Sequence, residues 1–313
     1  MIQSILVEGL IYGLMVLGVF ITFRILDFAD MTVDGSFPLG ACILAALVVQ
    51  DVNPAIAILV AFIAGCLAGL ITAIIHAKLH IPGLLAGILT MTMLYSINLR
   101  IMGNRANISL LKYNTLFTTV ANNTPSFISA DTAIVIVLLI IVLAIKILMD
   151  LFFHTDFGLS MGALGSNQQM IISQGMNPQI IKAVGICLAN GLTGVAGAFA
   201  AMYQGFADVG SGTGVVVSGL ASLMLGEFVL RSNKISVLTL RVLFGSIIYR
   251  GLMFLGRRYG YVIGLSANDL KLITGALIII CLIITNYDFG AQLRRRKPHV
   301  QNLNATKNKK DQI

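Results

Sequence analysis

The sequence predicts an all-α fold, a polytopic transmembrane helical bundle of about 8–10 helices, and three observations support this. First, the 313 residues are 57% hydrophobic and only 11% charged, with a mean hydropathy of +0.91, whereas soluble domains carry about 25% charged residues. Second, the apolar residues gather in runs close to the length of about 20 residues that spans a bilayer. Third, two similar segments with short, broken helices predict an inverted-topology repeat.

The apolar runs divide the chain into about nine candidate spans, of which the second is short and the seventh is interrupted by glycine. These runs are 3–23, 37–50, 55–77, 83–102, 131–149, 181–204, 213–230, 235–256 and 268–286. The first run is too long for the apolar region of a cleavable signal peptide. We therefore expect one transmembrane domain, residues 1–290, followed by a basic tail, residues 291–313.

The basic residues predict the orientation of the chain. Cytoplasmic loops carry an excess of Lys and Arg, and seven of these residues lie after the last run: Arg294, Arg295, Arg296, Lys297, Lys307, Lys309 and Lys310. Counting back from a cytoplasmic tail places the segment 150–180 inside and the loop 103–130 outside, with the N-terminus outside. No aromatic residues are interleaved with the basic ones, so the tail does not indicate nucleic-acid binding.

Motifs for nucleotide and metal binding are absent from the sequence. The four cysteines lie within apolar runs and form no CxxC pair, which is typical of small buried hydrophobic residues. The sequence has no phosphate-binding G-x-x-x-x-G-K-[ST] motif and no H-E-x-x-H, so the chain has no nucleotide site of its own. We expect no enzyme activity, no metal and no cofactor in this chain.

The internal repeat pairs Phe28-Ala29-Asp30 with Phe206-Ala207-Asp208, each after a long run and before a short one. Five spans separate the copies, so they should have opposite orientations. Broken helices expose backbone polar groups that lipid does not tolerate but a water-lined cavity does. The segments 28–40 and 206–219 are thus predicted to line a translocation pathway, with the candidate residues Phe28, Asp30, Thr32, Asp34, Ser36, Phe206, Asp208 and Ser211. Ordinary helix capping by Asp34 and Ser36 is the alternative.

Other polar residues near the spans are further candidates. Arg24 precedes a group of aspartates, which predicts either a solvated loop or a gate held by Arg24–Asp pairs. Glu227 is spaced to pair with Arg231, and Arg241 is placed to extend its side chain to the interface. In the fourth run, Thr92 and Ser96 share a face, which indicates either interhelical hydrogen bonds or pathway lining.

Residues 150–180 form a polar island between two strongly apolar runs. The island contains small residues and reads as a short amphipathic helix with glycine bends at both ends, either an interfacial loop or a docking element. Its pattern is T-x-x-G-x-x-x-x-A-L-G-x-N, from Thr155 to Asn167, with G-x-N at Gly175 to Asn177.

This pattern resembles the cytoplasmic coupling loop of the ABC-importer permeases that serve branched-chain amino acids, ribose-type sugars and related solutes. The stretch Asp30 to Ser36 also resembles the D-L-S-V-G-S of sugar-type members, with an inserted acidic residue, and the resemblance covers about residues 5–285. It implies ATPase-coupling roles for Thr155, Asp156, Gly158, Ala163, Leu164, Gly165, Asn167, Gly175 and Asn177.

The resemblance also implies partners and a location. The partners are ABC ATPase subunits that carry the ATP and Mg²⁺, an extracytoplasmic solute-binding protein and a second permease copy or paralogue. The location is the bacterial cytoplasmic (inner) membrane, in contact with the lipid bilayer. Leu159 and Ile172 stand where sugar-type members have basic residues, and Asn268 to Thr274 is closer to an amino-acid-like branch. We expect an amino-acid-like substrate, with a sugar or nucleoside as the alternative, and a secondary transporter or channel with inverted repeats as the rival function.

Overall fold

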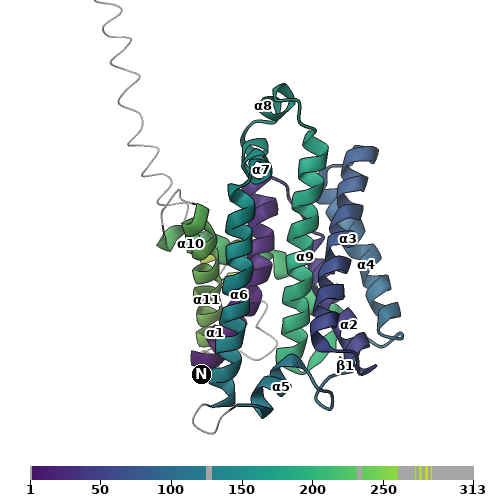
Figure 1. Cartoon of the computed structure of the whole chain (residues 1–313), viewed down its shortest axis with the longest axis vertical. Coiled ribbons are helices and arrows are strands. Elements are labelled where there is room, and N and C mark those ends of the chain that lie inside the picture. Colours follow the sequence, from purple (N-terminus) through teal and green to yellow (C-terminus); the bar gives the residue numbers. More distant parts are fainter. Residues whose placement is uncertain are drawn as a thin grey trace, which may run out of the picture.

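The computed structural model describes residues 2–124, 129–230 and 235–259, together with the single positions 272, 275, 276, 279, 280 and 283. Within this part of the chain, seven helices are long and apolar enough to cross a membrane, and an eighth apolar helix is shorter. The expected all-α membrane bundle is confirmed (Figure 1). The ninth apolar run, 268–286, and the basic tail, 291–313, lie outside the continuously described residues.

The helices follow the predicted runs closely. The elements in order are α1 (Ile2–Val19), the wide helical turn η1 (Phe20–Ile25), α2 (Val33–Val48), α3 (Pro54–Leu79), α4 (Gly83–Ile101), β1 (Asn107–Ser109), α5 (Leu116–Asn122), α6 (Ala130–His154), α7 (Asp156–Ser166), α8 (Gln168–Ser173), α9 (Pro178–Gln204), β2 (Phe206–Asp208), η2 (Val209–Gly212), α10 (Val215–Val229) and α11 (Ile235–Tyr259). The first eight expected spans correspond to α1 with η1, α2, α3, α4, α6, α9, α10 and α11.

Two long helices begin at the same dipeptide, Asn-Pro. The Asn53 side chain accepts a hydrogen bond from the Ala55 backbone N–H (2.9 Å), and Pro54 is the first residue of α3. Asn177 and Pro178 begin α9 in the same way. An asparagine satisfies a free N–H of the first turn, and the fixed φ of proline suits the first helical position.

The two ends of the bundle carry different connections (Figure 1). The short helices α7 and α8 lie at one end, which we call the α7 end. The strand β1, helix α5 and the N-terminus lie at the opposite end, which we call the β1 end. The loop 103–130 and the segment 150–180 are therefore on opposite sides, in agreement with the predicted topology.

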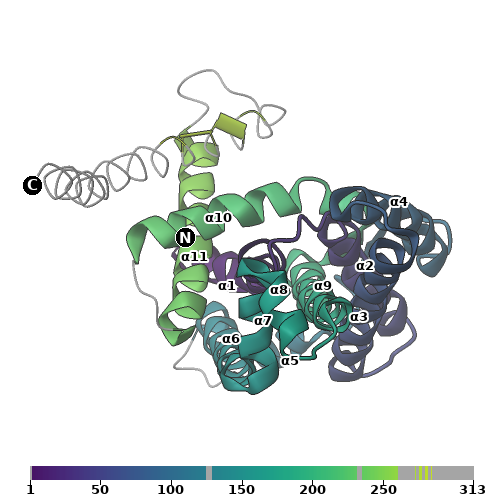
Figure 2. The same cartoon turned by 90° about the horizontal axis from the view of Figure 1, so that it is seen from above.

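Helices α1 and α9 form the centre of the bundle. Within their membrane-length windows, 78% of the residues of each are buried, whereas α3, α4 and α6 bury only 33%, 28% and 22%. Viewed along the bundle in Figure 2, α3, α6 and α9 are seen almost end-on. The exposed apolar faces of α3, α4 and α6 are therefore the surfaces available to lipid.

Glycines bring the backbone of α9 into direct contact with α2. A Cβ atom on Gly40 would lie 1.8 Å from the carbonyl oxygen of Gly194, and one on Gly197 would lie 1.9 Å from that of Phe37. Membrane helices gain little from the hydrophobic effect when they associate, because lipid is equally apolar, so close packing at small residues becomes the main attraction.

Helix α2 starts inside the bundle and not at its surface. Its 16 residues measure about 24 Å, less than the roughly 30 Å hydrocarbon core. Val49, just after its end, shares a cleft with Arg105 and Asn107 at the β1 end. The non-helical residues 26–32 lead inward from the α7 end, where the Phe28 ring packs against His76 (centroids 5.2 Å apart).

Helix α10 starts beside α2 but takes a different course. The preceding Gly212 packs against the Asp34 carbonyl oxygen inside the bundle. Near the other end of α10, Glu227 pairs with Arg24, the basic residue in the last turn of η1. In Figure 2, α10 is seen from the side as it crosses the bundle. The opposite orientation of the two repeat copies therefore stays a prediction.

A small antiparallel sheet at the β1 end was not predicted. Strand β1 pairs with β2, with Asn107 opposite Asp208 and Ser109 opposite Phe206. The second copy of the Phe-Ala-Asp motif is therefore a strand followed by a helical turn, and not the opening of a broken helix. The pairing fixes this copy to the loop that follows α4.

We predict that Gly197→Leu lowers the stability of the folded chain by about 1–3 kcal/mol, the usual cost of overpacking, because the side chain would collide with the Phe37 carbonyl. Thermal unfolding in detergent can be followed with a thiol-reactive dye, since Cys42 is fully buried. The control is Gly162→Ala on α7, where a Cβ meets nothing within 4 Å. An unfolding temperature for Gly197→Leu equal to that of Gly162→Ala would contradict the packing described above.

Candidate translocation site and docking platform

A cluster of buried polar side chains surrounds the start of α2. Asp30 Oδ1 accepts a hydrogen bond from the Thr32 backbone N–H (2.8 Å), and its Oδ2 accepts one from Asn190 Nδ2 (2.7 Å). Ser36 Oγ donates to Asn190 Oδ1 (2.5 Å). All four side chains are fully buried. Asn190 therefore joins both the non-helical residues 26–32 and the first turn of α2 to the centre of α9.

A chain of hydroxyl groups extends this cluster into α3 and α4. Thr32 Oγ1 lies 2.7 Å from Thr72 Oγ1 on α3, which donates to Thr90 Oγ1 on α4 (2.9 Å). Asn98 Nδ2, also on α4, donates to the Gly35 carbonyl oxygen (3.4 Å). Four helices thus share one polar network at the first broken segment.

Asp34 connects the two broken segments. Its carboxylate accepts hydrogen bonds from the backbone N–H groups of Gly214 (3.0 Å) and Val216 (2.7 Å) at the start of α10. A carboxylate at a helix N-terminus meets unpaired N–H groups and the positive end of the helix dipole. Asp34 and Ser36 lie inside α2 and do not cap it; Asp34 caps α10, and the N-cap of α2 is Thr32.

The two Phe-Ala-Asp motifs form the same local hydrogen bond, but they differ in how far they are buried. Asp208 Oδ1 accepts from the Gly210 backbone N–H (2.9 Å), as Asp30 does from Thr32. Asp208 is partly exposed at the β1 end, and Phe206 is 40% exposed, whereas Phe28 is buried. Ser211 follows in η2, and its Oγ is buried without a hydrogen-bond partner. The structure joins Asp30, Thr32, Asp34 and Ser36, and leaves Asp208 at the far end.

Asp30 and Asp34 form no ion pair with any Lys or Arg that the structure describes. Burying a charge without a counter-charge is costly unless hydrogen bonds compensate, and ionisable residues inside a membrane are functional candidates by default. Asp30 has no exposed surface, so a solute can reach it only after α2 and α9 separate. In the described ranges, no three His, Cys, Asp or Glu side chains are grouped to hold a metal.

Thr92 and Ser96 lie on the exposed face of α4, whereas Thr90, Leu94 and Asn98 on the same helix are buried. Thr92 Oγ1 donates to the Leu89 carbonyl within its own helix. The structure therefore does not bring Thr92 and Ser96 together with the Asp30 cluster. Sequence reasoning missed Thr72 and Asn190, although a lone Asn within an apolar run was a visible signal for Asn190.

The segment 150–180 forms a platform of two short helices at the α7 end. Its three cap positions act alike: the side chains of Thr155, Asn167 and Asn177 accept backbone hydrogen bonds at the starts of α7, α8 and α9. Gly175 has a positive φ of 78°, which favours glycine. We expected one helix here; Asn167 divides it into two.

Glycines attach α7 to the transmembrane helices. A Cβ on Gly158 would lie 2.3 Å from the Phe152 carbonyl oxygen, and one on Gly165 would lie 1.9 Å from that of Ile25. Leu164 is buried beneath the platform, whereas Asp156 is exposed and Ala163 is half-buried. The predicted coupling residues therefore mainly shape and anchor the platform. Its outward surface carries the exposed side chains of Leu159, Met170 and Ile172.

Arg24 pairs with Glu227 and not with the nearby aspartates. Arg24 Nε lies 3.0 Å from Glu227 Oε1, and Arg241 Nη2 lies 2.8 Å from the same oxygen. Arg241 is buried, with 7% of its surface exposed, so its side chain does not extend to the interface as expected. Arg231, the expected partner of Glu227, lies outside the described residues. Glu227 pairs with arginines on other helices, and the spacing of residues within one helix does not indicate such pairs.

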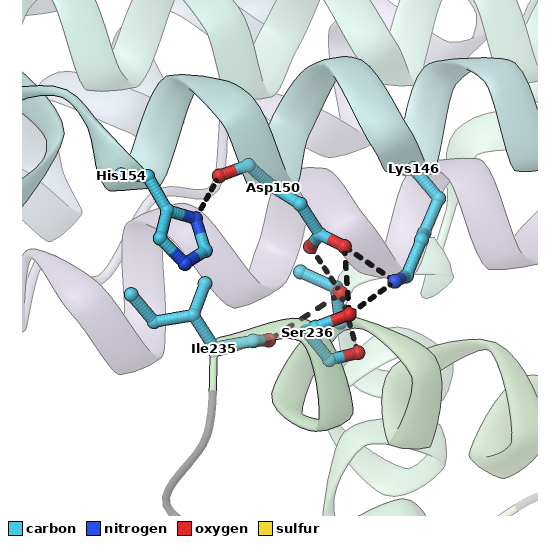
Figure 3. Close-up of polar contacts among 6 residues, drawn as sticks. Lys146, Asp150, His154, Ile235 and Ser236 are labelled. Carbon is cyan, nitrogen blue, oxygen red and sulfur yellow. Dashed lines mark hydrogen bonds and ion pairs between the residues drawn. The ribbon is translucent and has the colours of Figure 1, made fainter.

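A second ionic cluster joins α6 to α11 (Figure 3). Lys146 pairs with Asp150 one turn later, and Asp150 Oδ1 accepts a hydrogen bond from Thr239 (2.6 Å). Ser236 lies between them, 2.8 Å from Lys146 Nζ and 3.1 Å from Asp150 Oδ2. His154 turns away and contacts the Asp150 backbone carbonyl. This cluster fixes the start of α11 beside the platform.

At the opposite ends of α1 and α11, Glu8 lies 3.8 Å from Arg250 and 3.5 Å from Arg257. The Arg250 guanidinium is centred 3.2 Å above the Tyr12 ring, a cation–π contact, and Tyr12 stacks on Phe37. Such contacts strengthen when they are removed from water. Arg250 therefore has a structural role between α1, α2 and α11.

Comparisons with known proteins agree with these features. The sequence profile of the family described as "Branched-chain amino acid transport system / permease component" matches residues 1–282. The chain is 38% identical, over 95% of both chains, to a protein of Clostridioides difficile named "Tyrosine transport system permease protein". It is also 32% identical, over 88% of this chain and 94% of the relative, to an uncharacterised protein of Rickettsia prowazekii.

A solved structure, PsaBC from Streptococcus pneumoniae in complex with Fab, has the same fold by its TM-score of 0.51, with 15% identity over 89% of this chain and 90% of that chain. Together, the match over most of the chain, the seven membrane-length helices among the described residues and the likeness to one named permease establish the family. This chain belongs to the branched-chain amino acid transport system permease family and is a multi-pass membrane protein.

Proposed function

We propose that the chain is the membrane-spanning subunit of a binding-protein-dependent ABC importer for an amino-acid-like solute. The platform formed by α7 and α8 is the observation that supports this best. A secondary transporter does not need a glycine-anchored helix, α7, followed by a second short helix beyond the membrane spans. Such an element suits a soluble subunit that must push on the bundle. ATP and Mg²⁺ would then be bound by separate ATPase subunits.

The proposal places the α7 end in the cytoplasm of a bacterial inner membrane, with the tail, residues 291–313, on the same side. A solute-binding protein would deliver substrate at the β1 end, where β1, β2 and α5 lie. A second permease copy or paralogue would complete the transporter. The exposed faces of the membrane helices leave room for such a contact.

The mechanical link between the platform and the broken segments supports a coupling role. Gly165 of α7 contacts the backbone of Ile25, and the non-helical segment with Asp30 begins immediately after it. Displacement of α7 would therefore be passed to residues 26–32, and from there to the Asp30–Asn190 and Asp34–α10 hydrogen bonds. Breaking these bonds would open a polar route between α2, α9 and α10.

The substrate class is supported by a relative and by charge. The 38% identical relative is named for tyrosine transport. Two buried carboxylates at the first broken segment favour a solute with an ammonium group over a pure anion. Tyrosine and other α-amino acids satisfy both arguments.

The first prediction concerns the subunits. Affinity purification of the tagged, detergent-solubilised chain from its native membrane should yield a stoichiometric ATPase and a binding protein, identified by mass spectrometry. Uptake of tyrosine into proteoliposomes made with these partners should require ATP. A chain that purifies alone and drives proton- or ion-dependent uptake would instead be a secondary transporter.

The second prediction concerns the platform. Leu159→Asp and Ile172→Asp add charge to its exposed surface and should reduce capture of the ATPase by about tenfold or more, because a desolvated, unpaired charge at an interface costs more than 1.4 kcal/mol. Gly165→Arg should also impair capture by displacing α7 from Ile25. The matched control is Leu111→Asp, at an exposed residue of the β1 end. Unchanged capture and uptake for all three platform variants would refute the coupling role.

The third prediction concerns the pathway. The substitution Asp30→Asn replaces one acceptor oxygen of the carboxylate with an N–H₂ donor. This donor would face another donor, either the Thr32 N–H or Asn190 Nδ2. We therefore expect uptake to fall at least tenfold. Asp208→Asn keeps an oxygen to accept from Gly210 N–H, so any loss of uptake there reports the charge alone. Size-exclusion profiles check that both variants fold. If neither variant alters uptake, these segments do not line the pathway.

A further inference from the structure

A cleft of about 640 Å³ opens at the α7 end, between η1, α6, α7 and α11. One part of its wall is apolar and includes Phe20, Phe153 and Leu238. The other part is cationic and includes Arg24 and Arg241. The cleft therefore has two chemically different zones next to each other at the end of the membrane helices.

The cationic zone has more positive than negative charge. Glu227 is paired with both arginines through a single oxygen, Oε1, so one carboxylate meets two guanidinium groups. Each guanidinium has five N–H donors, and these contacts occupy one donor on each.

One of the remaining donors is buried without a partner. The Arg241 side chain is only 8% exposed, and its Nε–H has no acceptor among the described residues. A buried donor left without an acceptor is destabilising, and Arg241 cannot lose its charge to avoid this. Arg241 also lines the cleft, so an anionic acceptor that enters the cleft would meet a guanidinium whose hydrogen-bond donors are not all satisfied.

We propose that the cleft binds the headgroup of an anionic phospholipid, whose phosphate contacts Arg24 and Arg241 and whose acyl chains lie along Phe20, Phe153 and Leu238. Guanidinium groups bind phosphate oxygens in a bidentate way, and basic pockets between transmembrane helices bind anionic headgroups. A free inorganic anion would match the cationic zone but not the apolar wall. The inference rests on the proposed function only for assigning the site to the cytoplasmic leaflet.

Such a lipid would bridge the platform and the bundle. Gly158, Gly162 and Gly165 of α7 line the same cleft, so an occupied cleft would support α7 from beneath. Lipid composition would then affect how firmly the platform is held. This regulation is additional to the ATPase coupling proposed above.

The test is lipid retention by the purified full-length chain. Native mass spectrometry would count lipids retained after exchange into detergent with either phosphatidylglycerol or phosphatidylcholine. We expect phosphatidylglycerol to be retained at least tenfold more strongly. Arg241→Gln should remove about tenfold or more of this preference, as expected for one hydrogen bond to a charged group, and Arg24→Gln, at an exposed side chain, should weaken it without risk to folding.

Two controls separate binding from a structural role. Glu227→Gln removes the competing carboxylate and should strengthen phosphatidylglycerol retention, whereas mere disruption of the cluster would weaken it. Arg100→Gln, at an exposed residue in the last turn of α4, should leave retention unchanged. Equal retention of the two lipids, or no effect of Arg24→Gln and Arg241→Gln, would overturn the proposal. Displacement of the lipid by millimolar inorganic phosphate would show a free-anion site and would also overturn it. ATPase capture, measured separately, tests the proposed function independently.

Discussion

The contact between α9 and its neighbours is the constraint on which the rest of the structure depends. Gly40, Gly194 and Gly197 remove the side chains that would hold α2 and α9 apart. At this short separation, the Asn190 amide reaches Asp30 on one side of the break and Ser36 on the other. A break in a membrane helix is tolerated only where its free polar groups are satisfied by the protein, and here α9 supplies those partners.

The distribution of charge follows from the same constraint. Near the two ends of the bundle, carboxylates pair with basic side chains, as in Glu227 with Arg24 and Arg241, and Glu8 with Arg250. In the interior, Asp30 and Asp34 accept hydrogen bonds from amide and backbone N–H donors. A carboxylate that accepts hydrogen bonds from uncharged donors can exchange those donors for the ammonium group of a solute. A basic side chain already paired with the carboxylate would instead compete with that ammonium group. This arrangement suits a site that must bind a solute and then release it.

The sequence predicted most of the fold because its local signals were strong. Asn53-Pro54 and Asn177-Pro178 fix where α3 and α9 begin, since capping and proline geometry act within one turn. The long apolar runs fixed the number and order of the described spans. Each of the two Phe-Ala-Asp motifs precedes a short helix, α2 or α10, and Asp30 and Asp208 make the same hydrogen bond two residues ahead.

Side-chain partners and helix faces were decided only by the tertiary structure. In water, the apolar face of a helix identifies its buried side, but a membrane helix is apolar all round, so α4 gave no sign that Thr90 and Asn98 face inward and Thr92 and Ser96 outward. Likewise, three aspartates lie near Arg24 in sequence, Asp27, Asp30 and Asp34, yet its partner is Glu227, about two hundred positions away. The sequence by itself determined the spans, their caps and the repeat, which depend on short-range hydrogen bonding and hydropathy. The structure decided which polar groups meet, because in an apolar solvent that depends on close backbone packing between helices distant in the chain.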